Sequence, residues 1–242
     1  MEQVFVVRRA DYFNGDWPQG FIHLDDREAA DHLASLTAAG FFVDRPAAEE
    51  DPSLKQIIPY CVITRGTEIF LVRRRKKGTE ARLHGHYSIG LGGHIGPEDR
   101  TDGGNLLESG LLRELAEELI LPDFPASALR IAGLCNDDGN PVGQVHFGLV
   151  YRLDLSHQED SLQDHPDVRI REIQKLSGGF GRLVEIRDLW EDPACFEGWS
   201  RIVLVALFNL PRQGEVQPQL NQIKGNAREE QHSSGTHPGA EP

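Results

Sequence analysis

The chain has 242 residues, of which 39% are hydrophobic and 26% charged, the composition of an ordinary soluble globular protein. A net charge of -13 argues against a nucleic-acid backbone as the main partner. No apolar run approaches the ~20 residues that a bilayer-spanning helix needs, and the short, soon-charged N-terminus does not resemble a secretory signal. The three cysteines are far apart and odd in number, so we expect no disulfide framework and a reducing cytoplasm.

Residues 1–54 are predicted to form an extension that precedes the main domain. Apolar residues over 3–8 indicate a short strand, and an apolar stripe over 26–39 indicates a helix. Residues 44–54 are polar and contain prolines, which is typical of a connector.

A strong β pattern begins after this connector. Residues 56–64 and 69–75 flank a turn and predict a hairpin, and residues 87–91 predict a further strand. Pro59 lacks a backbone donor, so it predicts an edge or bulged position for the first of these strands.

Residues 105–121 predict an amphipathic helix, with Asn105 as its N-cap and Pro122 as its end. Further strands are predicted at 129–135, 142–155 and 168–174, a flexible segment at 177–181, and helices at 184–190 and 197–210. This order predicts an α/β fold in which helices flank a mixed sheet over residues 55–211. Residues 212–242, which have no aromatic side chain, are predicted to be a disordered tail.

Three acidic residues stand out on the predicted helix. Glu114, Glu117 and Glu118 are spaced so that their carboxylates project from one face. A bare helix surface gains nothing from crowding three negative charges, whereas a site for a hard divalent cation does. The alternative is a solvated acidic face with an ordinary ion pair between Arg113 and Glu117.

The segment from Gly92 to Leu121 resembles the Nudix box, G-x5-E-x7-R-E-U-x-E-E-x-G-U, in which U is a bulky aliphatic residue. The core of the pattern matches at the right spacing, through Arg113, Glu114, Leu115, Glu117 and Glu118. The segments KQIIPY, RLHGHYSIGLGGH and WS are also similar to a bacterial branch of the superfamily labelled as predicted phosphoesterases.

The loop before the helix departs from the pattern. Gly93 matches the opening glycine only with a six-residue insertion, placed within residues 96–103. Asn105 then stands where the first glutamate belongs, with Glu108 close enough to compensate, and Ile120 replaces the late glycine. The insertion carries three acids that could add ligands but for which a solvated loop is favoured, namely Glu98, Asp99 and Asp102.

The resemblance implies an α/β/α sandwich and a site for Mg²⁺, with Mn²⁺ as an alternative. The metal ligands that it implies are Glu114, Glu117, Glu118 and a backbone carbonyl at Gly92. Arg113 would orient the carboxylates, and one glutamate would accept a proton from the attacking water. His84, His86 and His94 are discounted as ligands, because a hard cation prefers oxygen.

Substrate contacts are less specific. The basic run after the second predicted strand places Arg73 and Arg75 on one strand face, where they could meet phosphates, although a charged strand end explains them equally well. Gly93 could let the backbone approach the substrate. Many Nudix enzymes recruit a further base or ligand from a later loop, for which Glu159, Glu172 and Glu185 are undiscriminated candidates.

The sequence therefore favours a metal-dependent pyrophosphohydrolase that acts on a nucleoside diphosphate derivative or a similar small molecule. A Nudix-fold binding or regulatory module with weak or no catalysis is the main alternative, and isomerase chemistry on a diphosphate-bearing substrate is a third. We expect a small-molecule diphosphate partner and no membrane or nucleic acid; a homodimer stays open.

Overall fold

The computed structural model of the protein describes residues 1–74, 85–156 and 167–212. Met1–Leu210 forms one compact unit. Pro211–Pro242 is a second unit, of which only Pro211 and Arg212 are described, so the predicted disorder of the tail lies outside the described residues. No helix in the described ranges is long and apolar enough to cross a membrane.

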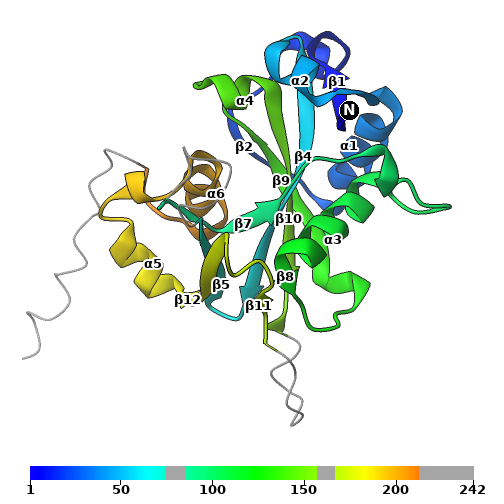
Figure 1. The fold of residues 1–242 in the computed structure, drawn as a ribbon. Coiled ribbons are helices and arrows are strands. Elements are labelled where there is room, and N and C mark those ends of the chain that lie inside the picture. Colours follow the sequence, from blue (N-terminus) through cyan, green and yellow to red (C-terminus); the bar gives the residue numbers. More distant parts are fainter. Residues whose placement is uncertain (75–84, 157–166, 213–242) are drawn as a thin grey trace, which may run out of the picture. The chain divides into compact units, whose positions relative to one another are not determined.

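A mixed ten-stranded sheet runs through the first unit, with the main path β12-β5-β4-β10-β9-β2 (Figure 1). In this sheet β4 and β10 are parallel, while the other paired strands in the described ranges are antiparallel. Its strands are β1 (Gln3–Arg8), β2 (Gly20–His23), β3 (Phe41–Asp44), β4 (Leu54–Arg65), β5 (Glu68–Arg74), β6 (Tyr87–Ser88), β7 (Gly90–Gly92), β9 (Leu129–Asn136), β10 (His146–Asp154) and β12 (Leu176–Arg182). A separate pair joins β8 (Leu119–Ile120) and β11 (Arg169–Ile170).

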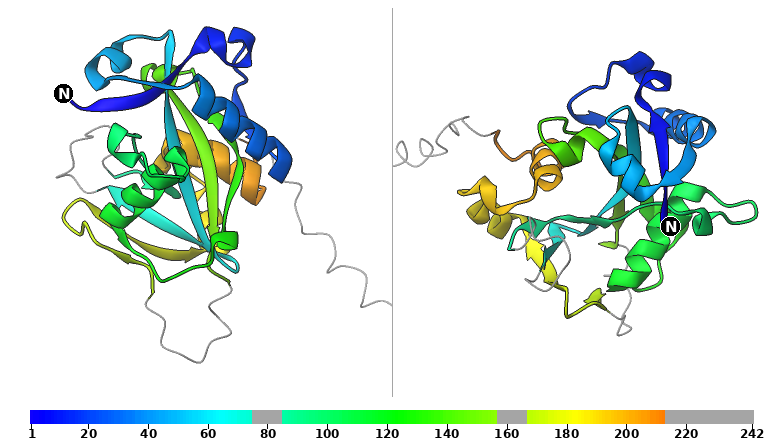
Figure 2. Two further views of the ribbon diagram at one scale, coloured as in Figure 1. Left: turned by 90° about the vertical axis from the view of Figure 1, so that its right-hand side faces the viewer. Right: turned by 45° about the horizontal axis from the view of Figure 1, so that its top comes forward.

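Helices cover both faces of this sheet. They are α1 (Asp26–Ala39), α2 (Arg45–Glu50), α3 (Leu106–Glu118), α4 (Pro141–Val145), α5 (Leu183–Leu189) and α6 (Gly198–Phe208). Side chains of β4 alternate between two cores, because Cys61 packs with the α3 side and Tyr60 with the α6 side. Figures 1 and 2 show α3 and α6 on opposite sides of the central strands. The predicted α/β fold with a mixed sheet is confirmed.

The first 54 residues are built into this sheet. The predicted strand over 3–8 is β1, which pairs with β3 and with β4, while β2 pairs with β9. The predicted helix over 26–39 is α1, and the Asp25 side chain caps it by accepting from Glu28 N at 2.8 Å. The predicted connector over 44–54 contains the short helix α2. Residues 1–54 therefore complete the sheet that carries the site, rather than preceding it.

Pro59 lies in a central strand, so the edge position predicted from it is wrong. The whole of β4 is buried except its last residue. The strand pairs with β1 over residues 54–56 and with β7 over residues 60–62, and Pro59 falls between these two stretches. A residue without a backbone donor is tolerated at such a change of partner.

Two predictions in the C-terminal half also need correction. The predicted strand over 142–155 begins only at His146, because Asn140 caps the short helix α4 by accepting from Gly143 N at 2.9 Å. The segment predicted to be flexible, residues 177–181, is paired along β12 with β5. A Cβ on Gly178 would lie 2.1 Å from Leu71 O, so close strand approach requires glycine there.

Candidate active site

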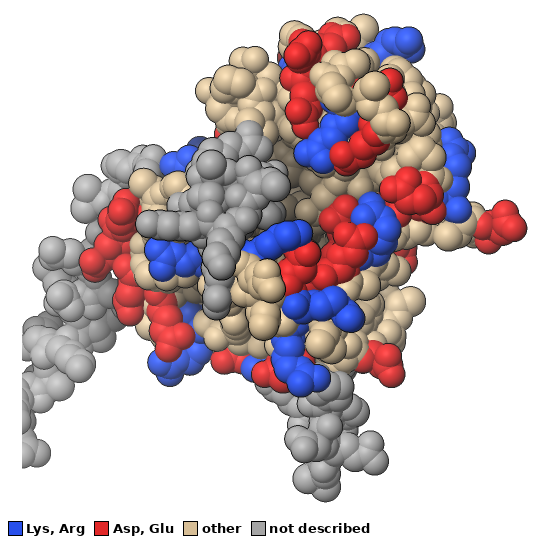
Figure 3. All heavy atoms as spheres, viewed as in Figure 1, with Lys and Arg blue, Asp and Glu red and all other residues tan. Residues whose placement is uncertain are grey.

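The candidate site is built on α3, whose two faces differ in character. Leu107, Leu111 and Leu115 are fully buried against the sheet, which fixes the rotation of the helix. Arg113 and the three glutamates remain on the other side and are partly or fully accessible. Figure 3 shows acidic side chains gathered over α3, with basic side chains next to them.

Arg113 is the centre of the hydrogen bonds at this site. Its guanidinium donates to both carboxylate oxygens of Asp99, at 2.7 and 3.0 Å. It also donates to Glu114 at 2.9 Å and to Glu117 at 3.1 Å. A fifth bond, of 2.9 Å, reaches the backbone oxygen of His94. The hydrogen bonds to Asp99 are the largest cause of a raised Arg113 pKa, so the group stays fully charged.

Asp99 therefore takes the role that the sequence assigned to position 105. It stands six positions after Gly93, which is the spacing of the first glutamate in the box, and its side chain is 2% exposed. The short turn Pro97–Asp99 holds it, with Gly96 N donating to its carboxylate at 2.9 Å. The extra residues consequently fall after Asp99 and before α3. The expectation that the acids of this loop are all solvated is wrong for Asp99.

Asn105 has a different task. Its side-chain oxygen accepts from Leu107 N at 3.0 Å and Glu108 N at 3.3 Å, so it is the N-cap of α3, as predicted. A residue in that position faces the helix end rather than Arg113. Glu108 is therefore not needed to compensate for a missing carboxylate.

The three box glutamates differ in environment. The Glu114 side chain is 19% exposed, and burial is the main cause of its raised pKa, against the opposing influence of Arg113. Glu117 is 58% exposed and reaches the same Arg113 nitrogen. The backbone oxygen of Glu118, at the end of α3, accepts from Arg171 N at 2.8 Å. The carboxylates of Asp99, Glu114 and Glu117 thus surround one guanidinium, and Glu118 adds a fourth acid on the same helix, so the cluster has excess negative charge.

Gly92 and Gly93 are required by close approach of neighbouring atoms. A Cβ on Gly92 would lie 1.8 Å from Pro59 O in β4. A Cβ on Gly93 would lie within 2.5 Å of the Glu114 carboxylate. Neither residue has the positive φ that would itself demand glycine. The glycine strand is therefore in direct contact with the acidic face of α3.

No group of three or more His, Cys, Asp or Glu side chains is arranged as a ready metal cage within the part of the chain that the structure describes. Glu114 and Glu117 instead contact Arg113. Their chemistry fits a magnesium ion, which is usually held by one or two carboxylates together with substrate oxygens and waters. Burial lowers the pKa of His94 to about 3, so that ring is neutral, and its Nε2 lies 3.2 Å from Nε2 of His146. His84 lies outside the described residues.

The loop before β12 brings Glu172 and Lys175 close to the end of α3. The sequence did not indicate that these two residues form a pair. Glu172 N lies 3.4 Å from Glu118 O, and Lys175 Nζ donates to the Glu172 carboxylate at 2.7 Å. The Lys175 pKa is raised by Glu172 first and also by Glu117 and Glu118, which places its charge near the acidic face. Glu185 instead pairs with Arg182, and Glu159 lies outside the described residues. Of the two later-loop candidates that the structure describes, Glu172 is thus the one beside the site.

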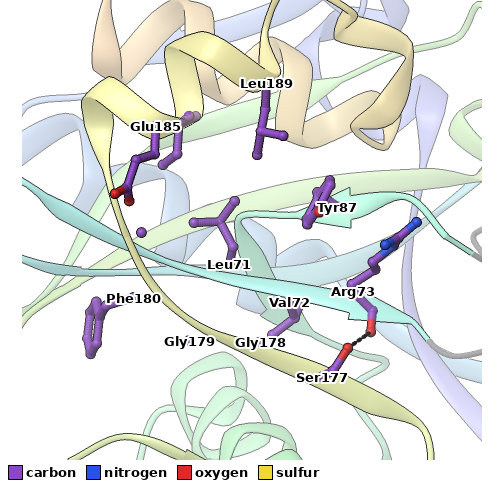
Figure 4. Close-up of a pocket in the computed structure, with 12 residues that line it drawn as sticks. Leu71, Val72, Arg73, Tyr87, Ser177, Gly178, Gly179, Phe180, Glu185 and Leu189 are labelled. Carbon is purple, nitrogen blue, oxygen red and sulfur yellow. Dashed lines mark hydrogen bonds between the residues drawn. The ribbon is translucent and has the colours of Figure 1, made fainter.

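Arg73 lies on the wall of a separate cavity of about 400 Å³, between β5, β6, β12 and α5 (Figure 4). Its Nε donates to Gly85 O at 2.8 Å, and its guanidinium lies 5.3 Å from the centre of the Tyr87 ring. Within the described ranges, no hydrogen bond or ion pair joins Arg73 to the acidic face of α3. Arg75 lies outside those ranges, so its predicted substrate contact stays a prediction.

Known proteins with similar sequences or structures agree with this fold. Protein YmaB of Bacillus subtilis (strain 168) is 34% identical over 208 residues, covering 84% of this chain and 96% of that protein. The crystal structure of Tm1382, a candidate Nudix hydrolase, matches with a TM-score of 0.66 and 27% identity, over 87% of this chain and 100% of that one. A crystal structure of a Nudix hydrolase from Alicyclobacillus acidocaldarius is more distant, at 15% identity and a TM-score of 0.38 over 58% of this chain and 84% of that one. No family model matches the chain.

A mixed sheet between helices, with a carboxylate-bearing helix behind a glycine strand, is the architecture of the Nudix fold that Tm1382 shares. The chain belongs to the Nudix superfamily.

Proposed function

We propose that this Nudix hydrolase cleaves a phosphoanhydride linkage in a small molecule, such as a nucleoside diphosphate derivative, with a divalent cation. The observation that carries the proposal is the charge of the α3 cluster. Asp99, Glu114, Glu117 and Glu118 outnumber the single guanidinium of Arg113, and the Glu114 carboxylate lies against Gly93, which directly follows the glycine strand. A divalent cation stabilises such an excess of carboxylates by neutralising their charge, and the same cation can bind the oxygens of an anionic substrate.

The metal ligands and the residue that positions them would be the following. Glu114, Glu117, Glu118 and the carbonyl of Gly92 would hold Mg²⁺ or Mn²⁺, which neutralises diphosphate charge and lowers the pKa of a bound water. Arg113 keeps Glu114 and Glu117 in place through its bonds of 2.9 and 3.1 Å.

Further roles follow from the positions of other residues. One of the box glutamates, or Glu172 beside them, would accept the proton of the attacking water. Lys175, whose charge lies near Glu117 and Glu118, would contact a substrate phosphate. Gly93 would leave room for the substrate to approach the backbone. Arg73 and Arg75 would contribute less to substrate binding than Lys175.

Hydrolysis of a panel of nucleoside diphosphate derivatives with Mg²⁺ or Mn²⁺ tests this function. We expect cleavage at the diphosphate, and a loss of about 100-fold or more in Glu118→Gln. Glu50→Gln, which changes an exposed carboxylate on α2, is the matched control and should keep full activity. Binding of a panel compound without turnover by the wild type would instead favour the binding module.

A further inference from the structure

Four buried or half-buried polar side chains meet on the α6 side of the sheet, away from the acidic face of α3. Tyr60, Ser88, Glu197 and Ser200 are called here the hydroxyl cluster. The Tyr60 hydroxyl donates to Glu197 Oε1 at 2.8 Å and lies 2.8 Å from Ser200 Oγ and 3.2 Å from Ser88 Oγ. Ser200 Oγ also donates to Glu197 Oε1, at 2.7 Å.

The cluster sits where the chain changes from one strand partner to another. Residues 87–88 pair with β5, whereas residues 90–92 pair with β4. Ile89, between them, donates its backbone N–H to Ser200 Oγ at 2.9 Å instead of to a strand. Ser88 Oγ donates to Gly90 O at 2.7 Å. The hydroxyls thus satisfy the backbone at the point where β7 begins.

Tyr60 links this point to the candidate active site. It is the direct cross-strand partner of Gly92, and its ring occupies the space beside Gly90, where a Cβ would lie 2.2 Å from it. The next residue, Gly93, is in contact with the Glu114 carboxylate. The same side chain therefore anchors to α6 at its hydroxyl and sets the position of β7 at its ring.

We infer that the hydroxyl cluster positions β7, and with it the Gly92 carbonyl and Gly93, against the acidic face of α3. This inference rests on the proposed function, because it concerns the placement of a metal and substrate loop. A phenylalanine at position 60 would fill the same core volume. The Tyr60 hydroxyl is therefore needed to position β7 and not to fill the core. Fully bonded buried polar groups favour one arrangement over nearby alternatives. Tyr60, Ser88 and Ser200 come from the three sequence segments KQIIPY, RLHGHYSIGLGGH and WS, in that order. The cluster therefore gives these three residues a common structural role.

The test compares two tyrosine-to-phenylalanine variants. Tyr60→Phe removes the hydroxyl that holds the cluster together. Tyr151→Phe is the matched control, because the Tyr151 hydroxyl is buried in β10 and makes no hydrogen bond among residues that the structure describes. Amide hydrogen exchange over residues 89–93 is measured in both variants, together with Mn²⁺ affinity and separate kcat and KM values.

In Tyr60→Phe we expect faster amide exchange over 89–93, Mn²⁺ affinity weakened by about 10-fold, and a similar fall in kcat with little change in KM. Tyr151→Phe should match the wild type in all of these. Ser200→Ala, a smaller change at the same cluster, should reproduce the Tyr60→Phe pattern. Equal exchange over 89–93 in Tyr60→Phe and Tyr151→Phe would overturn the inference. A wild type that binds no Mn²⁺ and cleaves nothing would overturn the proposed function instead, while the exchange result would still decide the role of the cluster.

Discussion

Asp99 and Arg113 form a two-bond ion pair, at 2.7 and 3.0 Å, that joins the loop after the glycine strand to the carboxylate helix. The aspartate is buried and the arginine is 30% exposed, so the pair is shielded from water on one side. Because Arg113 also contacts Glu114 and Glu117, this pair determines where two of the box glutamates point.

Removal of Asp99 should impair both folding and catalysis. Asp99→Ala leaves a partly buried guanidinium with fewer partners, and we expect a loss of about 3 kcal/mol in unfolding free energy. Asp99→Asn should cost less stability but still lower kcat, because Arg113 is then less firmly held. Urea unfolding and initial-rate measurements separate the two effects.

Asn105 provides the contrast. Asn105→Ala removes the N-cap of α3 and should cost about 1 kcal/mol of stability with kcat unchanged. Asn105→Asp keeps a cap and adds a carboxylate, yet it should not raise activity or rescue Asp99→Ala. Rescue by Asn105→Asp would show that position 105, and not 99, supplies the partner of Arg113.

Gly93→Ala should displace the Glu114 carboxylate, because the new methyl would lie within 2.5 Å of it. We expect Mn²⁺ affinity to fall by about 10-fold, measured by calorimetric titration. Gly179→Ala is the control, since a Cβ there meets nothing within 4 Å and its φ is not positive. Equal affinities in the two variants would argue against contact between Gly93 and Glu114 in solution.

The buried lysine of β4 leads to a pH prediction. Lys55 Nζ donates to Asn136 at 2.8 Å and to Asp138 at 2.5 Å, and Arg9 donates to Asp138 at 2.6 Å. Partial burial acts to raise the Asp138 pKa, but hydrogen bonds from Arg9 and Lys55 outweigh it and hold the pKa well below its usual range. The stability from this carboxylate is therefore present above its unfolded pKa of about 4 and is lost as pH falls through the lower folded value.

Asp138→Asn should thus be less stable than the wild type by about 2 kcal/mol at pH 7. The difference should shrink steadily as pH falls below ~4, because the carboxylate is then protonated in the unfolded chain while the folded protein still holds it ionised. Urea unfolding at pH 7 and at successively lower pH measures it. A difference that is constant with pH would mean that the Asp138 charge contributes nothing.

The sequence predicted the helix of the site more accurately than the loop. The Arg113–Glu118 core has a fixed helical spacing, so its residues could be assigned to one face without knowledge of the fold. Asp99 could not be assigned by counting backward from Arg113. That count cannot tell whether the six extra residues lie before or after the first acidic residue of the box. The spacing forward from Gly93 was the one available signal.

Other differences arise from contacts that a local pattern cannot show. Residues 177–181 suggested flexibility because glycine weakens strands, but β5 supplies their partner. Pro59 suggested an edge, although its strand is central and only changes partner there. The N-terminal strands gave no sign of their partners, β4 and β9, which follow much later in the chain.

The central claim, that the acidic face of α3 holds a divalent cation, is tested most directly by titrating the apo protein with Mn²⁺. The wild type should bind the ion saturably, Glu117→Gln should bind it about 10- to 100-fold more weakly, and Glu50→Gln should match the wild type. Equal affinity in all three proteins, or no saturable binding by the wild type, would contradict the claim.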